Sequence, residues 1–212
     1  MSLRRLPVYV LADCSGSMTG APIESVKSGI RELHNELMGD PQTIESAYLS
    51  VITFNTDAEQ LVPLTELPMF SPPDLVASGT TSLGAALKLL VNCIKNEVNE
   101  TTEEQKGDWK PLVFLLTDGA PTDDWESDAD IVRRNVSCNV ICVACGEGAE
   151  PEVLKRVSET VMVMRDMTPD SFKQFFKWVS ASIKQTSAKA GTVEEDAGVE
   201  LPPVPPVITI HP

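Results

Sequence analysis

A carboxylate and two hydroxyls occur at alternate positions directly after an apolar run near the N-terminus. Residues 8–11 are Val, Tyr, Val and Leu, and they are followed by Asp13, Ser15 and Ser17, with Gly16 between the serines. An apolar run of this kind is typical of a buried parallel strand, and a glycine allows the chain to turn sharply after it. The three side chains form a set of hard oxygen ligands without a nearby histidine, which suits Mg²⁺ rather than zinc or copper.

Two further stretches carry matching oxygen side chains. Thr80 and Thr81 follow Gly79 and open a helical pattern, and Asp118 comes soon after the apolar run 111–116. Because open α/β folds bind ligands at the carboxyl ends of their strands, we expect these stretches to meet the first one. Mg²⁺ prefers octahedral oxygen coordination and keeps several waters. Such a site would leave a position open to a water or to a ligand carboxylate.

Alternating strands and helices must place these loops. Apolar or largely apolar stretches predict strands at residues 8–11, 47–54, 111–116, 139–144 and 161–164, and residues 58–63 return after a turn as a further short strand. Apolar residues at helical spacing predict helices at residues 21–38, 83–98, 123–135, 151–158 and 170–190. Pro63 and the nearby turn favour an antiparallel edge position for residues 58–63. The expected fold class is therefore α/β, a doubly wound, mostly parallel sheet with one short antiparallel edge strand and helices on both faces.

A change of composition separates residues 1–190, expected to be one domain, from residues 191–212. The second range holds four acidic residues and five prolines, without Lys or Arg. This composition predicts a disordered or loosely docked tail. Residues 207–210 could form a strand within it, but a short and isolated one.

The charge balance restricts the partners. The formal net charge is -14, from 31 acidic and 17 basic residues, which disfavours nucleic acid and anionic membrane surfaces. No apolar run approaches the roughly 20 residues of a membrane span, and the N-terminus lacks the apolar stretch of a signal peptide. The five cysteines are odd in number and suit a reducing compartment. We therefore expect a cytoplasmic protein that binds neither nucleic acid nor membrane.

The motifs together resemble a known metal site. The Asp-x-Ser-x-Ser sequence that begins at Asp13, the Gly-Thr-Thr sequence that begins at Gly79 and the Thr-Asp-Gly sequence around Asp118 resemble the metal-ion-dependent adhesion site (MIDAS) of the von Willebrand factor A family. The resemblance covers nearly the whole chain outside the tail and implies a Rossmann-like fold. Thr81 fits the family's register better than Thr80. The metal-coordinating positions that the resemblance implies are Asp13, Ser15, Ser17, Thr81 and Asp118.

The resemblance also implies a function. It implies a protein-binding module that presents Mg²⁺, or alternatively Mn²⁺ or Ca²⁺, to an Asp or Glu of a partner protein. The sequences around Asp13 and Asp118 look most like those of bacterial intracellular members, which include proteins associated with tellurite resistance and stress gene clusters.

Other hypotheses stay open beside this one. Asp13 alone could cap the first helix, with Ser15 and Ser17 as turn formers. A Mg²⁺-dependent hydrolase or phosphotransferase could use an aspartate nucleophile here, but it would need a second carboxylate at position 15 or a nearby lysine, and the three motif loops have neither. No Gly-x-Ser-x-Gly elbow and no phosphate-binding Gly-Lys-Ser/Thr loop occur. A scaffold with a purely structural metal is the third hypothesis. We expect a protein that is not an enzyme.

Several residues near or after the third motif have more than one interpretation. Asp123 and Asp124 either begin the following helix, influence the metal site by contacting its ligands, or face a basic partner. Trp125 is either an exposed anchor for a partner or a half-buried packing residue. Zinc binding by cysteines is disfavoured, because side chains three apart on a strand point to opposite faces. Buried thiols are expected at Cys138, Cys142 and Cys145.

Overall fold

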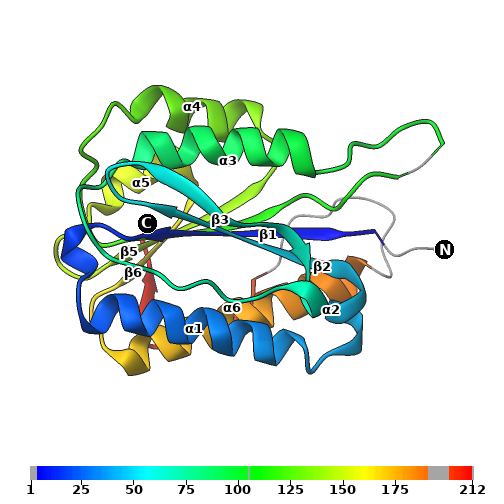
Figure 1. Ribbon diagram of the computed structural model, residues 1–212, viewed down its shortest axis with the longest axis horizontal. Helices are drawn as coiled ribbons and strands as arrows, with labels where there is room; N and C mark the ends of the chain where they lie inside the picture. Colours follow the sequence, from blue (N-terminus) through cyan, green and yellow to red (C-terminus); the bar gives the residue numbers. More distant parts are fainter. Residues whose placement is uncertain (1–3, 105, 191–200, 212) are drawn as a thin grey trace.

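The computed structural model describes residues 4–104, 106–190 and 201–211, in which strands and helices alternate (Figure 1). The strands are β1 (Leu6–Asp13), β2 (Ala47–Phe54), β3 (Ala58–Glu66), β4 (Leu112–Thr117), β5 (Asn139–Cys145), β6 (Thr160–Met164) and β7 (Ile208–Ile210). The helices are α1 (Ala21–Leu37), α2 (Pro41–Ser46), α3 (Leu83–Glu97), α4 (Glu126–Asn135), α5 (Pro151–Val157) and α6 (Pro169–Ala190). Short 3-10 turns follow β1 (η1, Gly16–Met18) and β3 (η2, Leu67–Met69).

Within these ranges the strands form one sheet in the order β3-β2-β1-β4-β5-β6-β7. From β2 to β6 in this order, each strand is parallel to its neighbour, whereas β3 is antiparallel to β2. The doubly wound α/β fold predicted from the sequence is therefore confirmed. Strand order reverses between β1 and β4, which is the point where such sheets bind their ligands.

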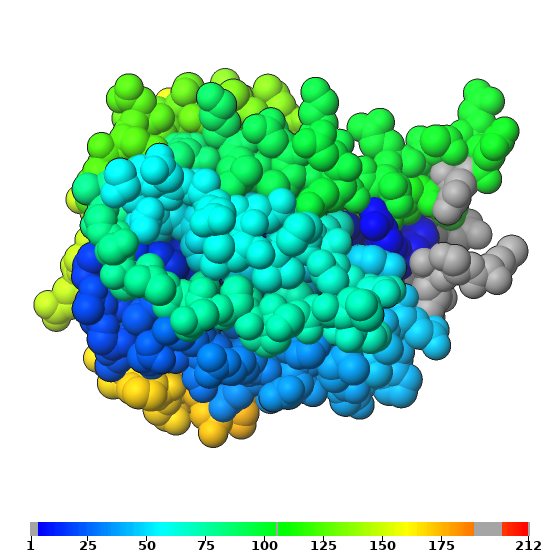
Figure 2. Space-filling model, in the orientation of Figure 1, coloured from blue at the N-terminus to red at the C-terminus, as the bar shows by residue number. Residues whose placement is uncertain are grey.

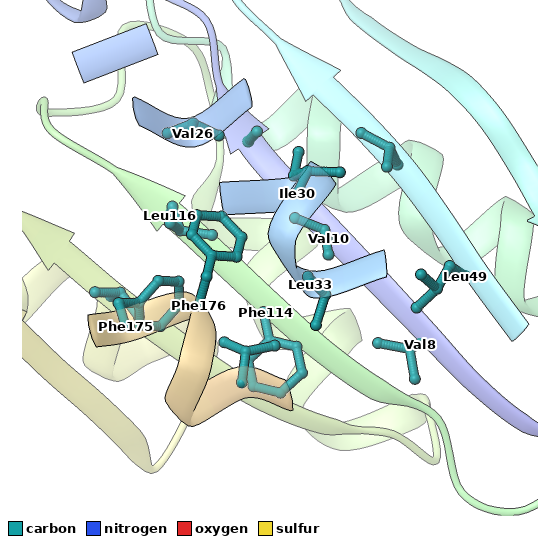
Figure 3. Close-up of a cluster of buried hydrophobic side chains, with 14 of the residues drawn as sticks. Val8, Val10, Val26, Ile30, Leu33, Leu49, Phe114, Leu116, Phe175 and Phe176 are labelled. Atoms are coloured by element: carbon teal, nitrogen blue, oxygen red, sulfur yellow. The ribbon is translucent and has the colours of Figure 1, made fainter. Parts of the chain in front are cut away.

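Helices cover both faces of the sheet. In Figure 1, α3, α4 and α5 lie above the sheet and α1, α2 and α6 below it. Each face has its own hydrophobic core, because residues of the buried strands alternate between the two sides. Figure 3 shows the core under α1 and α6, where side chains of both helices meet those of β1, β2 and β4.

The contact between α1 and α6 depends on a glycine. A Cβ atom added at Gly29 would lie 1.9 Å from Cδ2 of Phe176. The Phe176 side chain is 1% exposed and therefore has no free space to move into. This close approach brings α6 against α1 and seats α1, the helix that follows the first motif, on the sheet.

The C-terminal strand departs from the sequence prediction. Residues 207–210 were expected to form an isolated strand at most, but β7 pairs with β6 in antiparallel orientation, so both edge strands of the sheet are antiparallel. Ile208 is 3% exposed, and the Trp178 indole donates a hydrogen bond to the Pro202 carbonyl at 3.0 Å. The open edge of β6 offers unpaired backbone groups, which explains the pairing. All four acidic residues of the expected tail fall within residues 191–200, which lie outside the described residues.

Two details of the helices differ from the prediction. The helix predicted at residues 21–38 ends at Leu37, close to its predicted end, but the short helix α2 that follows was not predicted. The Asp40 carboxylate caps α2 by accepting hydrogen bonds from the backbone N–H groups of Gln42 and Thr43. The helix expected from residue 123 begins at Glu126 instead, because the Asp123 side chain caps a different helix. No helix in the described ranges has the length and apolar character that a membrane crossing requires.

Candidate metal centre

The three sequence motifs lie at the carboxyl end of the parallel strands, at the left in Figure 1. β1 ends at Asp13 and β4 at Thr117, on either side of the point where strand order reverses. The segment before α3 comes alongside the first motif, since Gly16 donates its N–H to the Gly79 carbonyl at 3.0 Å and Ser78 donates to Cys14 at 2.8 Å. Figure 2 shows this contact at the same end, as blue beside teal atoms.

Asp13 is buried and held in one orientation. Its side chain is fully shielded from solvent. Oδ1 accepts a hydrogen bond from the Ser15 backbone at 2.8 Å, and Oδ2 accepts one from the Thr117 hydroxyl at 2.6 Å. The first bond closes the turn after β1, and the second ties β1 to β4. The turn formation that the sequence suggested for this motif therefore exists, but α1 begins later, at Ala21, and is not capped by Asp13.

A chain of hydrogen bonds links the two serines to the second carboxylate. The hydroxyls of Ser15 and Ser17 lie 2.9 Å apart, and the Ser17 hydroxyl donates to Oδ1 of Asp118 at 2.7 Å. Residues separated by about one hundred positions are thereby joined. Ser15 and Asp118, at the two ends of this chain, are buried, whereas Ser17 between them is exposed, so the chain reaches solvent at its middle member.

Thr81, rather than Thr80, belongs to this group. Thr81 is 6% exposed, and a Cβ atom at Gly119 would lie 3.3 Å from the Thr81 hydroxyl, which places that oxygen beside the loop of Asp118. Thr80 is exposed, and its N–H lies 3.4 Å from the Thr56 hydroxyl. Among the described residues the Thr81 hydroxyl has no hydrogen-bond partner. The structure thus brings all five predicted site residues to one place.

The carboxylates of Asp13 and Asp118 lie near each other, and among the described residues no positively charged side chain is paired with them. Burial raises the pKa of the Asp118 carboxyl, and the charge of Asp13 raises it further, while the hydrogen bond from Ser17 acts in the opposite direction. In the part of the chain that the structure describes, no lysine or arginine forms an ion pair with either carboxylate. Negative charge accumulates here, and a bound cation would compensate it.

Sequence reasoning missed the role of Thr117 and only partly anticipated that of Asp123. Asp123 accepts hydrogen bonds from the backbone N–H groups of Gly84 and Ala85, each at 3.0 Å, and so caps the start of α3 from another loop. Ser82, the residue directly before α3, makes no side-chain cap of its own. These N–H groups are therefore occupied and are not offered to an external anion. For Thr117, the one available sequence signal was a hydroxyl at the end of a buried run.

Of the other residues singled out in the sequence, the tryptophan and the cysteines pack in the hydrophobic cores, with Cys138 only partly buried, whereas Asp124 is exposed. Trp125 is half-buried against the core under α3 and α4. All five cysteines have free thiols, and burial followed by the charge of Asp13 raises the pKa of Cys14 to about 12. Within the described ranges, no three His, Cys, Asp or Glu side chains are grouped as metal ligands would be. A metal at the sheet edge would therefore rely on hydroxyls in addition to two carboxylates.

These features define an α/β domain with hard oxygen groups gathered where its strand order reverses. The family model of the von Willebrand factor type A domain matches residues 8–178, and the chain belongs to this family. Domains of this family generally act as interaction modules. A comparison with curated proteins gave no match.

Several solved structures have the same fold. The von Willebrand factor type A protein from Catenulispora acidiphila superposes with a TM-score of 0.65 at 20% identity, over 85% of this chain and 43% of that one. Proximal thread matrix protein 1 from the mussel byssus gives 0.63 at 16%, over 86% and 49%. A second structure of it, with a zinc-occupied MIDAS motif, gives 0.61 at 18%, over 85% and 48%. This chain spans less than half the length of each of these structures, and at such identities the likeness shows the fold alone.

Proposed function

We propose that this chain is a protein-binding module that holds a divalent cation, Mg²⁺ by preference, and presents it to a carboxylate of a partner protein. The observation that carries the proposal is the chain of contacts joining two buried carboxylates to hydroxyls from separate loops, with no lysine or arginine of the described residues in ion-pair contact. The residues that would hold the ion directly or through water are Asp13, Ser15, Ser17, Thr81 and Asp118.

The chemistry of these groups supports a hard cation. All five supply oxygen, and the two carboxylates balance the charge of a divalent ion, which fits Mg²⁺ and leaves Mn²⁺ and Ca²⁺ as alternatives. Zinc occupies the MIDAS motif of the mussel protein, which supports divalent binding at this kind of site. The preference for Mg²⁺ here rests on the absence of His and Cys ligands from the five positions.

The exposure of the site supports a role in binding a partner rather than a purely structural metal. Ser17 and Thr80 are exposed at its rim, so a partner's Asp or Glu could reach a cation held there. The net charge of -14 favours a protein partner over nucleic acid or an anionic membrane. From the resemblance of the motif sequences, we extend the proposal to a cytoplasmic role in a tellurite-resistance or stress-response system.

An enzymatic role has less support. A phosphotransferase at this place would use cations or free helix N–H groups to hold phosphate. The first N–H groups of α3 are already bonded to Asp123, and position 15 is a serine rather than a second carboxylate. We therefore propose binding without bond cleavage.

The test compares metal binding and partner capture in the same variants. Asp13→Ala and Asp118→Ala should each abolish Mg²⁺ binding in calorimetry, and Asp57→Ala should not, because Asp57 is an exposed carboxylate on the neighbouring β2–β3 turn. Partners captured from lysate by the wild type in Mg²⁺ should be lost on adding a chelator and in the Asp13→Ala variant. Capture that persists without metal would contradict the proposal.

A further inference from the structure

The loop that carries Asp118 also fixes the backbone of Thr81. The Thr122 hydroxyl accepts a hydrogen bond from the Thr81 N–H at 3.1 Å, and the Thr122 N–H donates to the Thr81 carbonyl at 2.9 Å. Both backbone groups of Thr81 therefore bond to Thr122, and the Thr81 carbonyl also accepts a hydrogen bond from the Leu83 N–H at 3.1 Å. Because Thr122 lies only four positions after Asp118, this pairing joins the second and third motifs directly.

Asp123 extends the same attachment into α3. Its two carboxylate oxygens accept hydrogen bonds from Gly84 and Ala85. The backbone approach is close, since a Cβ atom at Gly84 would lie 2.6 Å from the Asp124 carbonyl oxygen. We call Thr122 and Asp123 together the clasp. The clasp leaves the Thr81 segment little room to move relative to Asp118.

The side chain of Thr81, unlike its backbone, is not held by a hydrogen bond among the described residues. Its hydroxyl has no hydrogen-bond partner among the described residues and lies beside Gly119, the residue after Asp118. The position of this hydroxyl is thus set by the clasp and not by a bond of its own. The separation between the Thr81 hydroxyl and the Asp118 carboxylate should accordingly depend on Thr122 and Asp123.

We propose that Thr122 and Asp123 are positioning residues that hold Thr81 and Asp118 at a spacing suited to Mg²⁺ and so favour Mg²⁺ over Ca²⁺. The inference rests on the proposed metal site. Mg²⁺ demands near-ideal octahedral geometry with ligands at about 2.0–2.1 Å, whereas Ca²⁺ accepts flexible geometry at about 2.3–2.6 Å. A loosened site should therefore lose Mg²⁺ affinity more than Ca²⁺ affinity.

The experiment measures Mg²⁺ and Ca²⁺ affinities by calorimetry for the wild type and three variants. Thr122→Val keeps the side-chain shape and removes the acceptor, and Thr122→Ser restores it. Thr65→Val is the matched control, because the Thr65 hydroxyl also bonds to a main-chain group, the Pro63 carbonyl at 2.7 Å, but on β3. Losing a group that orients a ligand costs about 10-fold to 100-fold in metal affinity.

The expected result is a Mg²⁺ affinity about tenfold or more weaker in Thr122→Val, with a smaller loss for Ca²⁺. The ratio of the two affinities should fall in Thr122→Val, recover in Thr122→Ser and stay unchanged in Thr65→Val. Equal losses for the two ions, or no loss, would overturn the positioning role while leaving the metal site intact. A wild type that binds neither ion would instead refute the proposed function itself.

Discussion

The hydrogen bond from Thr117 to Asp13 gives a sharp test of how the site is built. Thr117→Val removes the hydroxyl and keeps the β-branched shape, so the buried strand should stay filled. Thr117 is 3% exposed and its Oγ1 lies 2.6 Å from Oδ2 of Asp13, which is itself fully buried. Water therefore cannot readily replace the lost donor, and the carboxylate is left short of one partner.

The magnitude follows from the charge and burial of this pair. Hydrogen bonds to charged groups contribute about 1.5–3 kcal/mol, so the free energy of unfolding of the metal-free protein should fall by about 2 kcal/mol. For a domain of this size each kcal/mol shifts the melting temperature by about 2–4 °C, which gives a decrease of about 4–8 °C. Because Asp13 also loses its fixed orientation, Mg²⁺ affinity should fall about 10-fold to 100-fold.

The assay combines chemical denaturation without metal and calorimetric Mg²⁺ titration. Thr117→Ser keeps the hydroxyl and serves as the control, and it should retain most of the Mg²⁺ affinity even if the lost methyl group lowers stability. If Thr117→Val matches the wild type in both stability and Mg²⁺ affinity, the hydroxyl does not orient Asp13 and our reasoning about the site is wrong.

Three other predictions concern the surroundings of the site. Asp123→Ala should lower the free energy of unfolding by about 1 kcal/mol in urea denaturation, because α3 loses its cap, and an unchanged value would refute the capping role. Gly29→Ala should destabilise the fold by about 1–3 kcal/mol, since the new methyl group overlaps Phe176; a melting temperature equal to that of the wild type would show that α1 and α6 can separate freely. The raised pKa of Asp118 means that the folded metal-free protein favours the protonated carboxyl, so its stability contribution is present at low pH and is lost as pH rises through that pKa. Asp118→Asn should accordingly stabilise the metal-free protein at neutral pH, and its difference in unfolding free energy from the wild type should shrink as pH falls. The Mg²⁺ affinity of the wild type should weaken over the same fall in pH, because protons compete with the ion. A pH-independent difference in unfolding free energy would contradict this assignment.

The main features of the fold could be predicted from the sequence because they depend on local pattern. The β1 and β4 runs are apolar at every position but the last, and such runs form buried parallel strands. β1 ends at an aspartate and β4 ends next to one, and the alternation of strands with helices places both ends at one edge of the sheet. The meeting of Asp13 and Asp118 was therefore foreseeable.

Other features depend on contacts between distant segments, which no local pattern reveals. Asp123 looked like the first turn of its own helix, but its carboxylate caps α3, about forty positions earlier. β7 looked isolated because its partner edge on β6 exists only in the assembled sheet. The short helix α2 is different, because its start is marked locally by the Asp40 cap and by Pro41 at its first position.

The most direct test of the account is the position of a bound ion. Crystals grown with Mn²⁺ as a stand-in for Mg²⁺ should give an anomalous-scattering peak at the carboxyl edge of the sheet, between β1 and β4. The peak should lie within direct or water-mediated reach of the oxygens of Asp13, Ser15, Ser17, Thr81 and Asp118. A peak elsewhere, or none at this edge at a saturating Mn²⁺ concentration, would contradict the metal site on which the proposed function rests.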